Sequence, residues 1–157
     1  MCRKKFVVKV VGDYAWEQGQ ISGVIKDGID DFQKNKHGGK VGRLQNKERS
    51  VVRCANLVIV QSEYLKRVAL GWGAKNSKVE VIYNAVEFRR VDPIIHQGER
   101  WIVSVARLVP WKGMSMLIDL VLDLKNVKLK IVGDGPEMKN LELKIKELQL
   151  EDSVELL

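Results

Sequence analysis

The chain has 157 residues, enough for one ordinary domain or two small ones. Its composition, 45% hydrophobic and 30% charged, indicates a globular chain and excludes a disordered one. The net charge of +7 is uneven, because residues 1–90 hold 18 Lys and Arg against 9 Asp and Glu, and residues 91–157 hold 9 against 11. The basic first part could meet an anionic membrane or substrate, although solvated helix faces are the simpler explanation. Nucleic acid is not an expected partner, because no basic motif is interleaved with aromatic residues.

The cysteines, histidines and apolar runs exclude several further classes. Cys2 and Cys54 have no CxxC spacing, and His37 and His96 lie far apart in polar stretches. We therefore expect no metal site and no disulfide framework, and a reducing, cytoplasmic setting. Residues 6–11 form an apolar run that a lysine interrupts, which fits a strand better than a signal peptide. No apolar run approaches the roughly 18 residues of a membrane span.

The chain opens with a strand predicted at residues 6–11, which ends at Gly12 and Asp13. Residues 14–42 are polar and contain glycines, so we expect a long loop with a short helix near residues 29–33. Asp13 could act as a base, as an acceptor for a sugar hydroxyl or as a turn-former. Its position at the end of a strand favours the turn.

Helices and strands then alternate. Helices are expected at residues 43–55 and after Ser62, a plausible N-cap, and strands at residues 57–60 and 79–83. Asn84 follows the last of these strands in a turn, where a capping role is at least as plausible as ligand contact. The stretch from 88 onward is irregular, and we take residues 91–100 as a linker between parts 1–90 and 101–157.

The stretch W-I-V-S-V-A-R-L-V-P-W-K-G, from Trp101 to Gly113, predicts a strand buried on both faces, a tight loop and the start of a helix. Arg107 and Lys112 would lie between the carboxyl end of the strand and the helix N-terminus. In open α/β sheets ligands bind at this place, and two cations beside a helix N-terminus favour phosphate or diphosphate. Two solvated loop cations are the alternative.

A second glycine-containing turn follows the strand predicted at residues 128–132. It consists of Gly133, Asp134, Gly135 and Pro136. The glycines would let the backbone approach a ligand, or would serve a tight turn, and the third glycine of GxGxxG is absent. A helix to Gln149, with Pro136 in its first turn, and a strand at 153–157 complete the pattern. This alternation predicts an α/β fold with parallel sheets.

Four segments in order, L-V-I-V-Q-S-E-Y-L, V-E-V-I-Y-N-A-V-E-F, W-I-V-S-V-A-R-L-V-P-W-K-G and L-K-I-V-G-D-G-P-E, resemble the family 4 (group 1) retaining glycosyltransferases. The resemblance runs from about Phe6 to the last residue. It implies the GT-B architecture, in which two Rossmann-like domains face each other across a cleft. Residues 1–90 would be the later part of the acceptor-side domain, and residues 101–157 the first half of the donor-binding domain.

The resemblance also implies roles for individual residues. Arg107 and Lys112 would hold the diphosphate of a nucleotide sugar, so that neither a metal nor another cofactor is required. The turn from Gly133 to Pro136 would lie beside the donor nucleotide. Asn84 corresponds to the asparagine of an N-G-V-D turn at the cleft, whose glycine and aspartate are alanine and glutamate here. Asp13 falls where many members carry a histidine on the acceptor side, which makes it the candidate catalytic residue.

The function implied is transfer of a sugar, with retained configuration, from a nucleotide-diphosphate donor to an unidentified acceptor. A lipid-linked or glycan acceptor fits, and so does a cytoplasmic protein at the inner membrane face. The family's N-terminal glycine-rich loop and its acidic E-x₇-E segment are not among these residues, so we expect the isolated chain to have little or no activity. The alternative is a non-catalytic Rossmann-type nucleotide-binding module.

Overall fold

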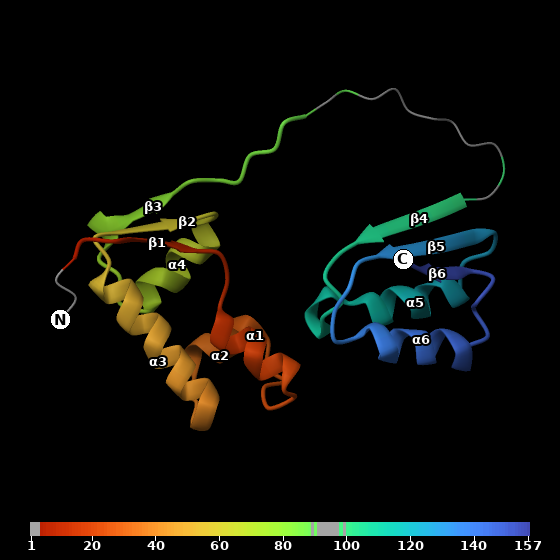
Figure 1. Cartoon of the computed structure of the whole chain (residues 1–157), viewed down its shortest axis with the longest axis horizontal. Helices are drawn as coiled ribbons and strands as arrows, with labels where there is room; N and C mark the ends of the chain where they lie inside the picture. Colours follow the sequence, from red (N-terminus) through yellow and green to blue (C-terminus); the bar gives the residue numbers. More distant parts are fainter. Residues whose placement is uncertain (1–3, 89, 91–97, 99) are drawn as a thin grey trace. The chain divides into compact units, whose positions relative to one another are not determined.

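The computed structural model describes residues 4–88, 90, 98 and 100–157. They form two compact units, Met1–Arg89 (unit 1) and Arg90–Leu157 (unit 2). Each unit has one three-stranded parallel sheet with helices packed on it (Figure 1). The predicted α/β class with parallel sheets is confirmed. Most of the predicted linker, residues 91–100, lies outside the described residues.

Unit 1 has a sheet of order β1-β2-β3. Its elements are β1 (Val7–Val10), α1 (Tyr14–Ile21), α2 (Ile29–Lys34), α3 (Gly39–Cys54), β2 (Leu57–Val60), α4 (Glu63–Gly71), the 3-10 helix η1 (Asn76–Lys78) and β3 (Val79–Val81). Val58 pairs in register with Val8 on one side and Val79 on the other. Helices α3 and α4 lie on the same face of the sheet (Figure 1). This follows from right-handed crossovers between strands that are laid down in sequence order.

The ends of the unit 1 helices agree with the local sequence signals. Ser62 caps α4, because its hydroxyl accepts a hydrogen bond from the Leu65 N–H at 3.1 Å, as predicted. Trp72 follows α4 and is 2% exposed within the core, beside the positive-φ Gly73. The core packs the inner faces of β1 and β2 against α3 and α4.

The prediction of a long loop at residues 14–42 is wrong in part. The short helix near 29–33 is confirmed as α2, but residues 14–21 form α1 and α3 already begins at Gly39. Helix α1 is only weakly amphipathic, because its apolar and polar residues are not separated onto two sides, so periodicity does not reveal it. Contacts outside the helix stabilise its start, since the Glu48 carboxylate accepts the N–H groups of Tyr14 and Ala15 at 2.8 and 3.3 Å.

Unit 2 has a sheet of order β4-β5-β6. Its elements are β4 (Arg100–Val105), the 3-10 helix η2 (Pro110–Lys112), α5 (Met114–Leu122), β5 (Val127–Val132), α6 (Met138–Glu147) and β6 (Val154–Leu156). Both helices lie on one face of the sheet (Figure 1). Pro136 was expected in the first turn of α6, but it lies in the turn before the helix starts.

The prediction that the first strand of unit 2 is buried on both faces is wrong for the described residues. Ile102 packs on the core, and the Ser104 hydroxyl meets the Met114 sulfur at 3.5 Å. The alternate residues Val103 and Val105 are 60% and 75% exposed. The reason is the same one-sided crossover, which places α5 and α6 together and leaves the other face of β4 without a helix from the described part of the chain.

Candidate functional site

Two loops meet at the carboxyl edge of the unit 2 sheet. One follows β4 and contains Arg107, and the other follows β5 and contains Asp134. Leu108 joins them, because its N–H donates to the Asp134 carbonyl at 2.8 Å and its carbonyl accepts from the Glu137 N–H at 3.1 Å. The Leu108 side chain is fully buried under them. The structure therefore brings the predicted cation loop and the predicted glycine turn together.

The two predicted cations lie on the loop side of this edge. Arg107 and Lys112 are both exposed, and Lys112 ends the 3-10 turn η2 directly before α5. Gly113 has φ of 69°, a left-handed conformation that turns the chain into α5 at little cost for a glycine. The first amides of α5 therefore follow immediately after Lys112, and its helix dipole adds partial positive charge there. This arrangement is suited to an anion with several oxygen atoms.

The structure explains why the second loop has glycine at two positions. The sequence alone could not decide between a structural role and a ligand-binding role for them. A Cβ atom on Gly133, whose φ is 148°, would collide with the backbone carbonyl of Ala106. A Cβ atom on Gly135 would collide with the carbonyl of Leu108. Glycine is therefore required for the two loops to approach each other. Their role beside a nucleotide stays a prediction.

Asp134 and Pro136 complete this turn. The Asp134 carboxylate accepts the N–H of Gly135 at 2.6 Å, which holds the turn in shape, and both Asp134 and Pro136 are exposed. Part of the Asp134 hydrogen-bonding capacity is thus used within the turn. Nothing in this geometry tests its predicted proximity to a donor nucleotide.

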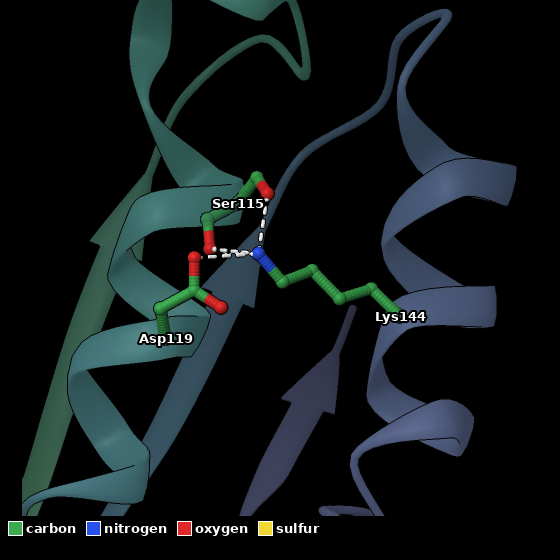
Figure 2. Close-up of polar contacts among 3 residues, drawn as sticks. All are labelled: Ser115, Asp119 and Lys144. Carbon is green, nitrogen blue, oxygen red and sulfur yellow. Dashed lines mark hydrogen bonds and ion pairs between the residues drawn. The ribbon is translucent and has the colours of Figure 1, made fainter.

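The start of α5 is anchored from the neighbouring helix (Figure 2). The Lys144 ammonium group of α6 donates to the Ser115 carbonyl at 3.0 Å, to the Ser115 hydroxyl at 2.7 Å and to the Asp119 carboxylate at 2.6 Å. The Lys144 side chain is 24% exposed, so this ion pair is partly shielded from water. The first two turns of α5, which follow Lys112, are thereby tied to α6.

Asp13 is buried in unit 1, not displayed in an open site. Its side chain is 1% exposed, one oxygen accepts the Trp16 N–H at 2.7 Å as the N-cap of α1, and the other accepts from the Gln33 amide at 2.5 Å. Gln33 in turn accepts from the indole N–H of Trp72 at 2.9 Å. Both carboxylate oxygens therefore stabilise the fold, as the turn-forming interpretation expects. The catalytic role stays a prediction.

Glu48 is a functional candidate that the sequence did not reveal. Burial, and then the negative charge of Asp13, raise the pKa of the Glu48 carboxyl to about 7, although the amide groups of Tyr14 and Ala15 oppose the shift. These partners lie more than thirty residues away along the chain, so no local pattern marks this glutamate. A carboxyl group that titrates near neutral pH in a hollow is a candidate for function.

Glu48 lines a hollow of about 360 Å³, here called the β1–α3 groove. Most of the side chains around it are apolar, and it runs along β1 and one side of α3. Its lining residues are Val8, Lys9, Val10, Val11, Gly12, Tyr14, Leu44, Lys47, Glu48, Val51, Val52 and Trp72. The groove is large enough for part of a small molecule.

Asn84 follows β3, as predicted, and is exposed. Its amide donates to the side-chain oxygen of Gln61, the residue that follows β2, at 2.6 Å. The two amide side chains therefore meet at the carboxyl edge of the unit 1 sheet. The position of Asn84 at an interdomain cleft is not tested and stays a prediction.

The described residues offer neither a metal cluster nor a membrane-spanning helix. Within residues 4–88, 90, 98 and 100–157, no cluster of three or more His, Cys, Asp or Glu side chains has the geometry of a metal site. In the same part of the chain, no helix combines the length and apolar character that crossing a membrane requires.

Comparison with known proteins gives the family context. Residues 86–157 match the family model "Glycosyl transferases group 1". The lipopolysaccharide core biosynthesis glycosyltransferase LpsD of Rhizobium meliloti is 35% identical over 91 residues, which are 54% of this chain and 26% of that protein. The N-acetylgalactosamine-N,N'-diacetylbacillosaminyl-diphospho-undecaprenol 4-alpha-N-acetylgalactosaminyltransferase of Campylobacter jejuni is 32% identical over 109 residues, 66% of this chain and 30% of that protein.

The chain is also similar to a solved structure, that of Anabaena Alr3699/HepE in complex with UDP and glucose. The aligned part is 72% of this chain and 36% of the Anabaena chain, with 26% sequence identity and a TM-score of 0.62. The fold class predicted from the sequence, α/β with GT-B relatives, is confirmed by these similarities. The chain spans only 26% and 30% of the length of the two curated relatives.

Proposed function

We propose that this chain is part of a group 1 glycosyltransferase that transfers a sugar from a nucleotide-diphosphate donor to an acceptor. Two findings support the proposal: the match of residues 86–157 to the family model, and the relatives that are named glycosyltransferases. We further propose the finer features implied by the family 4 resemblance, namely retained configuration and a reaction without metal. The 157 residues alone, which span under a third of these relatives, should have little or no transferase activity.

The donor diphosphate would bind at the carboxyl edge of the unit 2 sheet. The observation that carries this assignment is the joining of the two loops through Leu108, which puts the Arg107 loop and the Gly133–Pro136 turn at one place. Arg107 can offer two parallel N–H donors to a phosphate group, and Lys112 a compact charge. Both charges would stabilise the negative charge that grows on the leaving nucleotide as the glycosidic bond breaks.

The acceptor would be a lipid-linked sugar or another glycan. The relatives' names refer to lipopolysaccharide core and to a diphospho-undecaprenol substrate, and both substrates combine sugars with a lipid. The basic unit 1 fits such a substrate at an anionic membrane face. We propose a protein on the cytoplasmic side that contacts this face peripherally.

Thermal-shift measurements on the 157-residue chain test the donor site. UDP, GDP and ADP are compared with UMP and NAD, and at least one nucleoside diphosphate should raise the melting temperature more than UMP does. The rise should be lost in Arg107→Ala and in Lys112→Ala. Lys125→Ala removes an exposed lysine just before β5, at the opposite edge of the sheet, and should leave the rise unchanged.

Two results would contradict the assignment. The diphosphate site would be wrong if nucleoside diphosphates raised the melting temperature equally in the wild type and in both loop variants. A rise with NAD alone would favour the alternative, a non-catalytic Rossmann-type module, because NAD is not a glycosyl donor. Robust turnover of a nucleotide sugar by the isolated chain would refute the expected inactivity.

A further inference from the structure

We propose that Lys144 of α6 is a positioning residue for the donor diphosphate site, because it holds the first turn of α5 in place. The backbone amides of that turn come directly after Lys112, so their position decides how well an anion is bound there. The role rests on the proposed function for the identity of the ligand, a nucleoside diphosphate. Lys144 itself belongs to neither loop of that site and acts on the ligand through α5.

The start of α5 lacks a side-chain cap. Its N-cap residue, Gly113, has no side chain that could accept the first N–H groups of the helix. The first hydrogen bond within the helix runs from the Leu117 N–H to the Gly113 carbonyl at 3.0 Å. Met114 packs in the core and is 9% exposed, whereas Ser115 and Met116 are exposed. A helix start of this kind opens readily unless another element holds it.

Lys144 supplies an anchor from α6 (Figure 2). An ammonium group has three N–H donors, and Lys144 uses them on the Ser115 carbonyl, the Ser115 hydroxyl and the Asp119 carboxylate. Ser115 and Asp119 are four residues apart, so these bonds span the first two turns of α5. The apolar packing between α5 and α6 is not directional, whereas these hydrogen bonds are, so they fix the register of the two helices.

The anchor also connects the two loops of the site through the helices that follow them. Helix α5 begins after the loop that contains Arg107 and Lys112, and helix α6 begins after the turn at residues 133–136. The loops meet at Leu108, whose carbonyl accepts the Glu137 N–H at 3.1 Å just before α6. Lys144 joins the same two helices again, further along α6. Attachment at two separate points restricts how the helices, and the loops that lead into them, can shift.

Removal of Lys144 should therefore weaken diphosphate binding although no group that touches the ligand is lost. A ligand binds only those molecules in which its site is formed, so its apparent dissociation constant increases as that fraction falls. A formed first turn of α5 in about one molecule in five would raise the dissociation constant about fivefold.

Calorimetric titration of the 157-residue chain with UDP, GDP and ADP tests this role. Lys144→Met should raise the dissociation constant of the diphosphate that binds best by about fivefold. Lys144→Arg keeps the charge and several N–H donors, so it should recover most of the affinity. Lys146→Met removes the same charge from an exposed position on the same helix and should bind like the wild type.

A core variant separates positioning from a general loss of stability. Val121→Ala opens a cavity at the other end of α5 and so destabilises unit 2. It leaves the contacts of Lys144 in place and should keep wild-type affinity at temperatures well below melting.

Amide hydrogen exchange of the ligand-free chain tests the cause. In Lys144→Met, exchange should be accelerated more at the Leu117 amide, which closes the first turn of α5, than at the Leu129 amide of β5. The Leu129 amide donates to the Ser153 carbonyl at 2.8 Å within the sheet and reports the stability of unit 2 as a whole.

The outcomes distinguish the role of Lys144 from the donor site itself. Wild-type affinity in Lys144→Met, together with loss of binding in Arg107→Ala, would refute the positioning role and leave the diphosphate site standing. Equal weakening in Val121→Ala or Lys146→Met, or equal acceleration of exchange at Leu117 and Leu129, would also refute it, because stability or net charge would then explain the loss. Nucleoside diphosphates that do not bind the wild type, or that bind both loop variants equally well, would refute the donor site and the role of Lys144 with it.

Discussion

Replacement of Glu48 by glutamine should remove the contribution of this carboxyl group to the pH dependence of unit 1 stability near neutral pH. Burial and the charge of Asp13 raise the pKa of the folded carboxyl from 4.5 to about 7, whereas the unfolded chain titrates near the ordinary value. The folded state therefore binds more protons at this carboxyl between these values, so the stability that Glu48 contributes is fully present below pH 4.5 and is lost as the pH rises through 7. Glutamine carries no charge and keeps an acceptor for the Tyr14 N–H.

The size of this effect follows from the pKa difference and the exposure of the carboxyl. For a fully buried group, the free energy of unfolding would decrease by about 1.4 kcal/mol for each pH unit between its unfolded and folded pKa values. Because Glu48 is half-buried and solvent screens its charge, we expect its titration to lower the free energy of unfolding by about 1 to 2 kcal/mol in total. Glu48→Gln should thus equal the wild type or be slightly less stable at pH 5, and should be more stable by this amount at pH 8.

Urea unfolding at both pH values provides the assay. Trp16 and Trp72 belong to unit 1, and the substitutions Trp101→Phe and Trp111→Phe in the background remove the tryptophans of unit 2. Fluorescence then reports unit 1 alone, which avoids mixing two unfolding transitions. A stability difference that is the same at pH 5 and pH 8 would refute the reasoning, as would a wild type that loses stability on acidification within this window.

Three further predictions concern the fold around the sites. Gly133→Ala should lower the melting temperature of unit 2 strongly, because its Cβ would collide with a backbone carbonyl at positive φ, whereas Gly71→Ala, with open space around it, should have little effect. Lys144→Met should lower the free energy of unfolding in urea by about 1 kcal/mol, because it removes three hydrogen bonds, one of which is the partly shielded ion pair with Asp119. Lys146→Met, at an exposed position on the same helix, is its control. Ser62→Ala should cost about 1 kcal/mol through loss of the α4 cap, and Ser62→Thr should recover most of it.

Local signals predicted most of the strands. The short apolar runs at 57–60 and 128–132 coincide closely with β2 and β5, because a few neighbouring residues of high β-propensity suffice to mark a buried strand. The same signals failed for α1, whose apolar residues do not form one stripe along the helix. That helix is stabilised by Asp13 at its own start and by Glu48 from α3. The contact with Glu48 is a tertiary one, so no local pattern predicts it.

The candidate diphosphate site was also found in part from the sequence. The spacing of Arg107 and Lys112 between a strand and a helix was sufficient to place both at the carboxyl edge of the sheet. The sequence alone could not explain Gly133 and Gly135, because their pattern is compatible both with a ligand that approaches the backbone and with a tight turn. The structure adds a definite reason, the close approach of two loops whose contact residues are far apart in the chain.

The sequence by itself determined the parallel α/β organisation, the cap at Ser62 and the order of loops and strands, because periodicity, capping and turn chemistry act over a few neighbouring residues. Only the tertiary structure decided which face of β4 is covered, how the two loops of unit 2 join through Leu108, and why Glu48 titrates near neutral pH. These features depend on desolvation and on contacts between atoms brought together from distant parts of the chain, and no local pattern of residues records such distances.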